Sequence, residues 1–365
     1  MARVRARGEE IRRYILEKID QHPSDISKLT SDRFNITRQA VNLHLRKLTL
    51  EKVLTNSGAT RNHSYKLAPL VQWSQAYEIT PDLSEGDIWS HEIKPVFGLQ
   101  PENVTDIWQY GFTEMFNNAK DHSGSPTILV SISRTAMLSE MIILDKGVGI
   151  FRKIQQALNL LDERYAVLEL AKGKFTTDPD HHTGEGIFFA SRMFDSFNIR
   201  SGGCFFTHTV GGSQDWLLET QEGTGTAVFM KLSNHTSRTS KEIFDQYSSG
   251  EDYGFTRTVV PVKMAQYGDD KLISRSQAKR VLARVELFKT VVFDFSGVDT
   301  VGQAFADEIF RVFPLQHPEI NLVPISMSEG VEQMVKRARL EAYVSGLAKP
   351  AIVESSPGGT EKPPD

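Results

Sequence analysis

Apolar residues near the amino terminus recur at helical spacing and then give way to short strand-like runs. Residues 9–21 carry Ile11, Ile15 and Ile19 four positions apart, which predicts an amphipathic helix that ends at the following His-Pro. A second short helix is expected over 24–33. Thr37 is a suitable N-cap for a third helix, whose apolar positions are Ala40, Val41, Leu43, Leu45 and Leu48.

Two strand patterns follow this third helix. Residues 53–55 and 64–67 flank the polar run Asn-Ser-Gly-Ala-Thr-Arg-Asn-His, which predicts a hairpin. The three helices and the hairpin resemble the winged helix-turn-helix domain of bacterial repressors, over residues 1–70. The resemblance implies that the third helix enters the major groove of double-stranded DNA and that the hairpin contacts backbone or minor groove. The implied DNA-binding residues are Thr37, Arg38, Gln39, Asn42, Arg46 and Arg61.

Charge is distributed unevenly along the chain. Residues 1–67 hold fourteen Lys or Arg against seven Asp or Glu, whereas the whole chain has a net charge of −4. A basic segment attached to an acidic remainder of the chain is typical of a nucleic-acid-binding domain fused to domains of another function. The alternative is a winged helix that serves only protein contact or dimerisation.

Three short motifs stand in order in the middle of the chain. Glu114, Asn118 and His122 are spaced by four, so on a helix they share one face, which can meet a phosphate chain and its metal. The apolar run 141–144 predicts a buried strand that ends at Asp145, followed by Gly147 and Gly149. Thr183, Gly184 and Gly186 open an apolar helix over 187–197, and a helix amino end is an anion site. Together they indicate a nucleotide pocket.

The order and spacing of these motifs resemble the GHKL ATP-binding fold, an α/β sandwich shared by gyrase B, histidine kinases and anti-sigma-factor serine kinases. The resemblance covers residues 84–232. It implies that Mg²⁺ is bound by Asn118, that Asp145 accepts the adenine amino hydrogen, and that Glu114 orients or deprotonates an attacking water or hydroxyl. The nucleotide-binding set implied in this way is Asn118, His122, Asp145, Gly147, Gly149, Lys174, Thr183, Gly184, Gly186 and Thr226.

Residues between the second and third motifs are expected to form an apolar helix around 158–170 and then a mobile loop. The loop is polar and punctuated by Gly and Pro. Lys172 and Lys174, which lie in it, either reach terminal phosphates or are solvated charges. Both interpretations stay open.

The remainder of the chain divides by composition. Residues 233–253 are rich in Ser, Thr and charge and predict a linker, and residues 346–365 predict a disordered tail. Between them, over 254–345, strand and helix patterns alternate. This part resembles STAS-like domains of the DUF4325 type, relatives of anti-sigma antagonists. Where a phosphorylatable antagonist carries Asp-Ser-Ser-Gly, this chain has Gly302-Gln-Ala-Phe, which argues against a phosphoserine switch.

Length and composition fit a multidomain soluble protein, and the three resemblances together imply a multidomain α+β fold. At 365 residues the chain exceeds one ordinary domain. No apolar run approaches the roughly 20 residues that span a membrane, and the charged amino terminus is not followed by a secretory apolar stretch, so we expect a cytoplasmic protein. The single cysteine, Cys204, excludes an internal disulfide.

Two functional hypotheses follow. The first is a signalling or transcription regulator in which Mg-ATP occupancy or slow hydrolysis controls binding of DNA or of a regulatory protein partner. We expect it to act as a homodimer. The second is an anti-sigma-factor-like serine kinase with Glu114 as the base. A histidine kinase is less well supported, because no long helical hairpin separates His91, in His-Glu-Ile-Lys-Pro, from Glu114.

Overall fold

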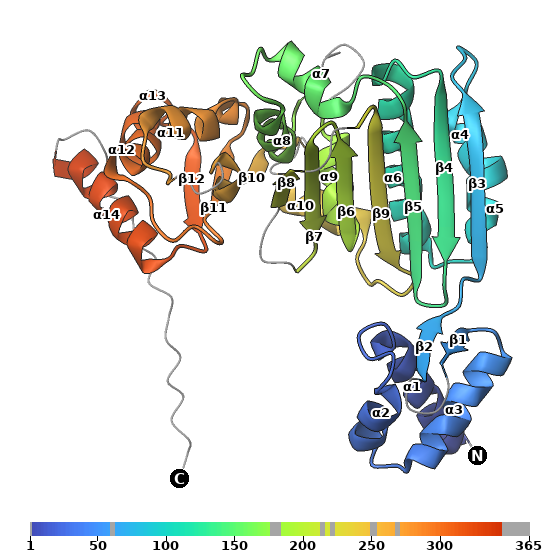
Figure 1. The fold of residues 1–365 in the computed structure, drawn as a ribbon. Coiled ribbons are helices and arrows are strands. Elements are labelled where there is room, and N and C mark those ends of the chain that lie inside the picture. Colours follow the sequence, from blue (N-terminus) through green and yellow to red (C-terminus); the bar gives the residue numbers. More distant parts are fainter. Residues whose placement is uncertain are drawn as a thin grey trace, which may run out of the picture.

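The computed structural model describes residues 2–58, 63–175, 184–211, 216–219, 223–248, 254–266 and 271–344. These residues form a mixed α/β structure with three sheets (Figure 1). We refer to residues 2–67 as the N-terminal unit, 71–247 as the central unit and 257–344 as the C-terminal unit. Within the described part of the chain, no helix combines the length and apolar character needed to cross a lipid bilayer.

The N-terminal unit has three helices and a hairpin, in the order that periodicity predicted. Thr37 caps the third helix as expected, because its Oγ1 accepts from the Ala40 N–H at 3.2 Å. Ile11, Ile15 and Ile19 pack together with Val41 and others in a small separate core. The elements are α1 (Ala2–Lys18), α2 (Ile26–Phe34), α3 (Arg38–Leu50), β1 (Leu54–Ser57) and β2 (Ser64–Leu67), with β1 and β2 antiparallel.

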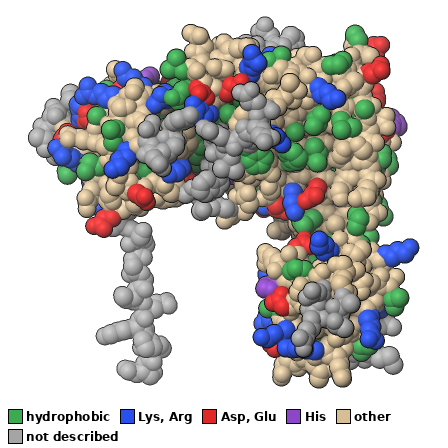
Figure 2. Space-filling view, in the orientation of Figure 1, with side chains coloured by type: hydrophobic (Ala, Val, Ile, Leu, Met, Phe, Trp, Pro, Cys, Tyr) green, Lys and Arg blue, Asp and Glu red, His purple; other side chains and the backbone are tan. Residues whose placement is uncertain are grey.

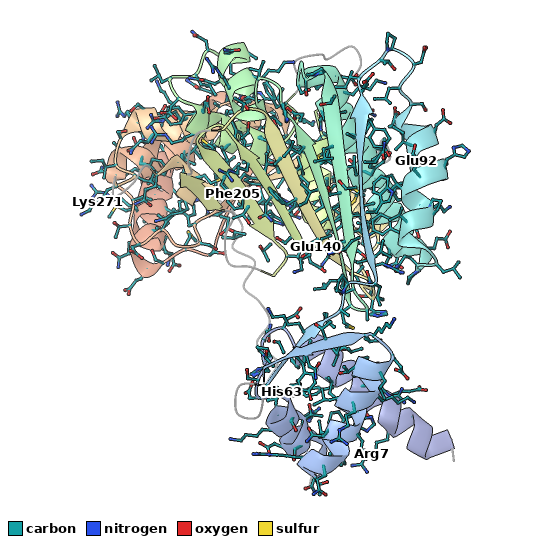
Figure 3. The ribbon with its side chains drawn as sticks, turned by 45° about the vertical axis from the view of Figure 1, so that its right-hand side comes forward. Arg7, His63, Glu92, Glu140, Phe205 and Lys271 are labelled. Carbon is teal, nitrogen blue, oxygen red and sulfur yellow. The ribbon has the colours of Figure 1, made fainter. Side chains whose placement is uncertain are left out.

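The central unit is built on a seven-stranded sheet in which every neighbouring pair is antiparallel. Its edge strand β3 follows the hairpin after only residues 68–70. The strand therefore precedes residue 84, which the sequence resemblance gave as the start of this domain. In Figures 1 and 3 the N-terminal unit therefore lies just below this end of the sheet. The strands, in sheet order, are β3 (Val71–Glu78), β4 (Thr127–Arg134), β5 (Leu138–Asp145), β9 (Thr226–Ser233), β6 (Ser196–Ser201), β7 (Cys204–Thr209) and β8 (Trp216–Glu219).

Helices cover one face of this sheet (Figure 1). Alternate strand residues such as Val130 and Met141 are buried, and the long helix α6 contributes Trp108, Phe112 and Phe116 to the same core. This alternation is the period-two pattern of a sheet with one packed face. The helices are α4 (Glu85–Ile88), η2 (Trp89–Ile93), α5 (Lys94–Phe97), α6 (Glu102–His122), α7 (Ile150–Ala157), α8 (Glu163–Lys172), α9 (Gly186–Met193) and α10 (Ser240–Tyr247).

The segment predicted as a linker contains helix α10. Thr239 and Glu242 form a reciprocal capping box at its start, which stabilises a short helix even in a Ser- and Thr-rich stretch. Phe244 then packs on Phe189, with ring centres 4.5 Å apart. The linker prediction is thus wrong for residues 240–247. The predicted tail, 346–365, lies outside the described residues.

The C-terminal unit is a parallel three-stranded sheet with helices. Strand order is β10-β11-β12, so each connection crosses over through helical segments. Its core is continuous with that of the central unit: the Phe255 ring lies 4.6 Å from Phe188 and 5.1 Å from Phe288. The elements are β10 (Arg257–Pro261), η3 (Val262–Ala265), α11 (Arg275–Leu282), η4 (Val285–Leu287), β11 (Thr290–Asp294), α12 (Gln303–Asp307), η5 (Glu308–Val312), α13 (Phe313–Gln316), β12 (Asn321–Ile325) and α14 (Glu329–Val344).

Candidate functional site

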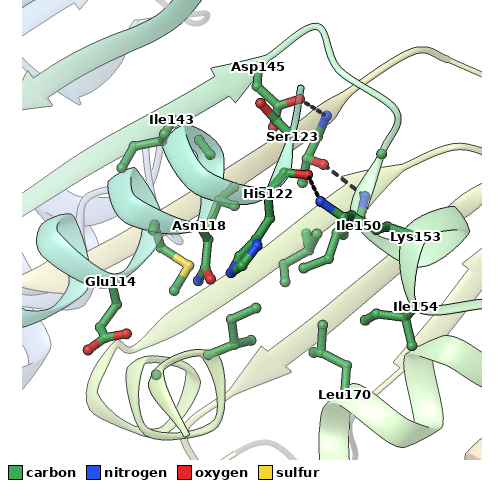
Figure 4. Close-up of a pocket in the computed structure, with 18 of the residues that line it drawn as sticks. Glu114, Asn118, His122, Ser123, Ile143, Asp145, Ile150, Lys153, Ile154 and Leu170 are labelled. Carbon is green, nitrogen blue, oxygen red and sulfur yellow. Dashed lines mark hydrogen bonds between the residues drawn. The ribbon is translucent and has the colours of Figure 1, made fainter. Parts of the chain in front are cut away.

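A cavity of about 260 Å³ lies between the helical layer and the sheet, next to the carboxyl end of β5. Helices α6, α7, α8 and α9 and strands β5, β6 and β9 all contribute to it (Figure 4). It is lined by Glu114, Met115, Asn118, Ala119, His122, Ser123, Ile143, Asp145, Gly149, Ile150, Lys153, Ile154, Leu170, Phe175, Gly184, Gly186, Ile187, Ile199, Thr226 and Val228.

The polar side chains of α6 meet this cavity together. Glu114, Asn118 and His122 all line it, as their spacing predicted. Figure 4 shows Asn118 and His122 directed into a space whose other side is formed by Ile154 and Leu170. The opposite stripe of α6, with Trp108 and Phe112, is fully buried in the core, so the polar stripe is left to the cavity.

Asp145 is the last residue of β5 and is 5% exposed. Its Oδ1 accepts from the Gly147 N–H at 2.8 Å and from the Thr226 N–H at 3.3 Å. Burial raises the pKa of Asp145, and these backbone donors lower it in part. A carboxylate has about four acceptor positions, so the two backbone bonds to Oδ1 and a hydrogen bond with the Thr226 side chain still leave acceptor capacity toward the cavity.

Two glycines allow the loop after Asp145 to pack tightly. A Cβ on Gly147 would overlap the Ser123 carbonyl group, which caps the end of α6 against this loop and accepts from the Val148 N–H at 2.9 Å. Gly149 has φ 94°, and a Cβ there would lie 2.6 Å from Ser201 Oγ. Gly149 lines the cavity, whereas Gly147 is not among the lining residues and packs against Ser123 at the end of α6.

Thr226 lies beside Asp145 in the sheet register and lines the cavity. Its Oγ1 accepts from the Ile150 N–H at 3.1 Å, so the hydroxyl fixes the start of α7. Gly184 and Gly186 line the same space. Thr183 lies outside the described residues.

Lys153 is a cavity residue that sequence reasoning missed. It comes from α7, and its Nζ donates to the His122 carbonyl oxygen at 2.5 Å (Figure 4). The sequence feature that could have identified Lys153 is its position one helical turn after the second glycine of the Asp-x-Gly-x-Gly motif. The apolar wall was also missed, because Ile143, Ile199 and Val228 come from three different strands.

Lys174, by contrast, points to the C-terminal unit. Its Nζ donates to the Leu287 carbonyl oxygen at 3.1 Å and lies 5.0 Å from the centre of the Phe288 ring. Burial lowers the pKa of Lys174, and the Glu185 carboxylate opposes that shift. Its placement favours a contact between units over a contact with a bound phosphate.

Five of the six candidate DNA-binding residues lie on α3 or at its N-cap. Arg38, Gln39, Asn42 and Arg46 are exposed, and Figure 2 shows further Lys and Arg side chains on the N-terminal unit. The Thr37 hydroxyl is used as the helix cap, and Asn42 Oδ1 accepts from Ser27 Oγ at 3.1 Å. Arg61 lies outside the described residues.

His91 is exposed on the short π-helical segment η2. Its Nδ1 lies 3.0 Å from the Asp87 carbonyl oxygen, which can only accept a hydrogen bond. The helical segment carrying it ends at Phe97, and α6 begins at Glu102 after a short turn. The structure thus has no long helical hairpin between His91 and Glu114.

Residues 277–332 match the family model of the STAS-like domain of unknown function DUF4325. The match runs from α11 into α14 and includes β11 and β12. No curated protein and no solved structure matches the chain. The C-terminal unit therefore contains a STAS-like domain.

Proposed function

We propose that this protein is a GHKL-type, Mg-ATP-binding regulator whose N-terminal unit is a winged helix that binds double-stranded DNA. One observation carries the nucleotide part of the proposal. Glu114, Asn118 and His122 from a helix, Asp145 from a strand end, and Gly184 and Gly186 from a later turn all line the same cavity. Motifs that are far apart in the sequence are not expected to line one cavity unless they form a common site.

The sheet side of the cavity suits an adenine ring. Ile143, Ile199 and Val228 supply apolar surface for a planar ring, and Asp145 lies among them. The exocyclic amino group of adenine is a donor, and a buried carboxylate with remaining acceptor capacity is its complement. Asp145 thus provides the directional contact, while its neighbours provide contact area.

The α6 side of the cavity suits Mg²⁺ and a phosphate chain. Glu114 and Asn118 offer carboxylate and amide oxygens, which Mg²⁺ prefers. Among the described residues, no group of three or more His, Cys, Asp and Glu forms a metal cluster. This fits Mg²⁺, which typically takes one or two protein ligands together with waters and phosphates. When bound, the ion would neutralise phosphate charge.

Two features of the chain itself would hold the phosphates. The amino end of α9 begins at Gly186, beside the α6 carboxylate, since a Cβ on Gly186 would overlap Glu114. Free N–H groups at a helix start attract anions. The Lys153 ammonium, on the other side, brings a positive charge to the cavity.

Glu114 is the proposed general base. It lies near Tyr110: burial, followed by the charges of the Glu114 and Glu185 carboxylates, raises the pKa of the Tyr110 hydroxyl. A carboxylate at the phosphate end of the cavity can orient a water or a partner's hydroxyl for attack. The same geometry would serve slow hydrolysis of ATP or transfer of its terminal phosphoryl group to a serine. Water as the acceptor corresponds to the regulator, and a partner's serine hydroxyl corresponds to the kinase.

The test is to incubate the full chain with Mg²⁺ and ATP labelled in its terminal phosphate, with and without duplex DNA. Label in free phosphate supports a slow ATPase, label on an added protein supports the serine kinase, and stable bound ATP supports a nucleotide sensor. Glu114→Ala should keep nucleotide binding and lose turnover, whereas Asn118→Ala should lose the Mg²⁺ dependence of binding. Wild-type turnover in Glu114→Ala would exclude the general-base role.

A further inference from the structure

Helix α8 is buried around its whole circumference. Its last seven residues, 166–172, are all buried, whereas a surface helix buries a single stripe. Leu170 faces the cavity. Another side contacts strand β10 of the C-terminal unit, where Thr258 Oγ1 donates to the Lys172 carbonyl oxygen at 2.6 Å. The cavity wall and the STAS-like domain therefore share this helix.

Lys172 joins the end of α8 to the end of α11. Its Nζ donates to the carbonyl oxygens of Arg280 at 3.0 Å and Ala283 at 2.8 Å, and to Glu169 Oε1 at 2.6 Å. The two carbonyls belong to the last turn and the C-cap of α11, where helix carbonyls carry partial negative charge; the Arg280 carbonyl oxygen also accepts from the Ala283 N–H at 3.4 Å. All three ammonium hydrogens thus have an acceptor in a fully buried position.

Arg284 extends the same link to the cavity itself. It stands between α11 and η4 with φ 62°, and its guanidinium donates to the Lys174 carbonyl oxygen and to Glu169 Oε2 at 3.4 Å. The guanidinium carbon lies 5.2 Å from the centre of the Phe175 ring, within the range of a cation–π contact. Phe175 lines the cavity. A side chain from the C-terminal unit therefore contacts a residue of the cavity wall directly.

We propose that the STAS-like domain sets the ligand affinity of the cavity, with Arg284 as the positioning residue that holds Phe175 and the adjacent backbone in place. This inference rests on the proposed nucleotide function. Because coupling between two sites is reciprocal, nucleotide binding must also stabilise the contact of residues 169–175 with the C-terminal unit. The STAS-like domain is then the part of the chain that senses cavity occupancy.

The C-terminal unit offers a matched control for Arg284. Arg339 also donates to a backbone carbonyl, that of Leu322 at 3.3 Å, and also lies over an aromatic ring, that of Phe310 at 5.4 Å. Its contacts stay within the C-terminal unit. Arg339→Ala therefore removes the same kinds of contact without touching the cavity.

The experiment measures Mg-ATP affinity of the full chain by calorimetry, together with hydrogen exchange of residues 169–175 in the empty protein. Arg284→Ala should raise Kd by about fivefold or more, the lower end of typical coupling between sites, and should speed exchange in this segment. Arg339→Ala should change neither quantity. Arg284→Lys, which keeps the charge near Glu169 but lacks the planar group, should recover only part of the affinity.

Two failures can be told apart. If the wild type binds Mg-ATP and folded Arg284→Ala binds it equally well, the inference is overturned and the proposed function stands. If the wild type does not bind Mg-ATP, the proposed function fails. Hydrogen exchange of residues 169–175 then tests whether Arg284 positions this segment, and equal exchange rates in Arg284→Ala and Arg339→Ala reject that role. Should Arg284→Ala not fold, Arg284→Lys takes its place, and wild-type affinity in that variant rejects the inference.

Discussion

Replacing Lys172 by methionine removes the charge that connects α8 to the C-terminal unit while keeping an unbranched apolar side chain. The side chain of Lys172 is 1% exposed and that of Glu169 is 5% exposed. The substitution removes hydrogen bonds to three acceptors and leaves the Glu169 carboxylate paired with Arg284, 3.4 Å away. Removing one member of a buried pair typically costs about 3–5 kcal/mol, and we expect a loss in that range.

A double-variant cycle separates the ion pair from the rest of this loss. Glu169→Gln combined with Lys172→Met removes both charges of the pair, so the double variant should lose about 0.5–3 kcal/mol less than the sum of the single losses. The exposed pair of Lys241 with Asp245, 2.5 Å apart on α10, is the control. Lys241→Met should cost less than about 1 kcal/mol, as surface pairs do.

The assay is urea unfolding of the full chain, followed by circular dichroism and extrapolated linearly to water. Burial lowers the pKa of Lys172 from 10.5, against the raising effect of Glu169. The folded chain therefore binds this proton less readily than the unfolded chain, and stability should rise with pH between the folded-state pKa and 10.5. A loss below about 1 kcal/mol for Lys172→Met would refute the reasoning, because that is the cost at an exposed pair.

Three further predictions address the other parts of the chain. Gly147→Ala places a methyl group against the Ser123 carbonyl and should destabilise the protein by about 1–3 kcal/mol; an unchanged melting temperature would show that the loop relaxes. Burial, together with the charge of Arg12, lowers the pKa of His44 in the folded chain, so His44 of the unfolded chain takes up its proton at a higher pH. The melting temperature should therefore fall as the pH drops below 6.5, and His44→Gln should remove this fall. The full chain should bind duplex DNA with a steep salt dependence, and Arg38→Ala should weaken sequence preference; no shifted complex at low salt would favour a protein-contact role.

Local periodicity was sufficient to predict the structure of those parts of the site that lie close together in the sequence. The spacing of Glu114, Asn118 and His122 places them on one helix face, because the α-helix repeats every 3.6 residues. The apolar run before Asp145 forms a strand that ends at that residue. Thr37 caps its helix for an equally local reason: its side chain reaches an N–H three residues away.

Contacts between distant segments were not predictable in this way. Ile199 and Val228 reach the cavity only because strand β9 lies between β5 and β6 in the sheet, an order that the sequence does not follow. Lys174 has its acceptor, the Leu287 carbonyl, 113 residues along the chain. No pattern around the lysine points to that partner.

The helix expected around residues 158–170 begins later in the structure: α7 ends at Ala157 and α8 begins at Glu163. Asn159 adopts φ 49°, a left-handed conformation that ends a helix, and the Asp162 side chain accepts from the Arg164 N–H at 2.9 Å to begin the next one. The apolar periodicity carries across the break because both helices pack on the same core. Hydrophobic spacing alone therefore placed the start of the helix about one turn before the capping residue that begins it.

The central claim is tested most directly by the affinity of the full chain for Mg-ATP, measured by calorimetry in the wild type and in Asp145→Asn. Asparagine keeps an oxygen for the Gly147 and Thr226 N–H groups, but it turns a donor toward the adenine amino group, so affinity should fall by about 1–3 kcal/mol. Asp294 is the control, because it also ends a strand and accepts from an N–H two residues on, that of Ser296 at 2.9 Å. The account predicts that Asp145→Asn weakens binding while Asp294→Asn does not; equal affinity in all three proteins, or no binding by the wild type, would contradict it.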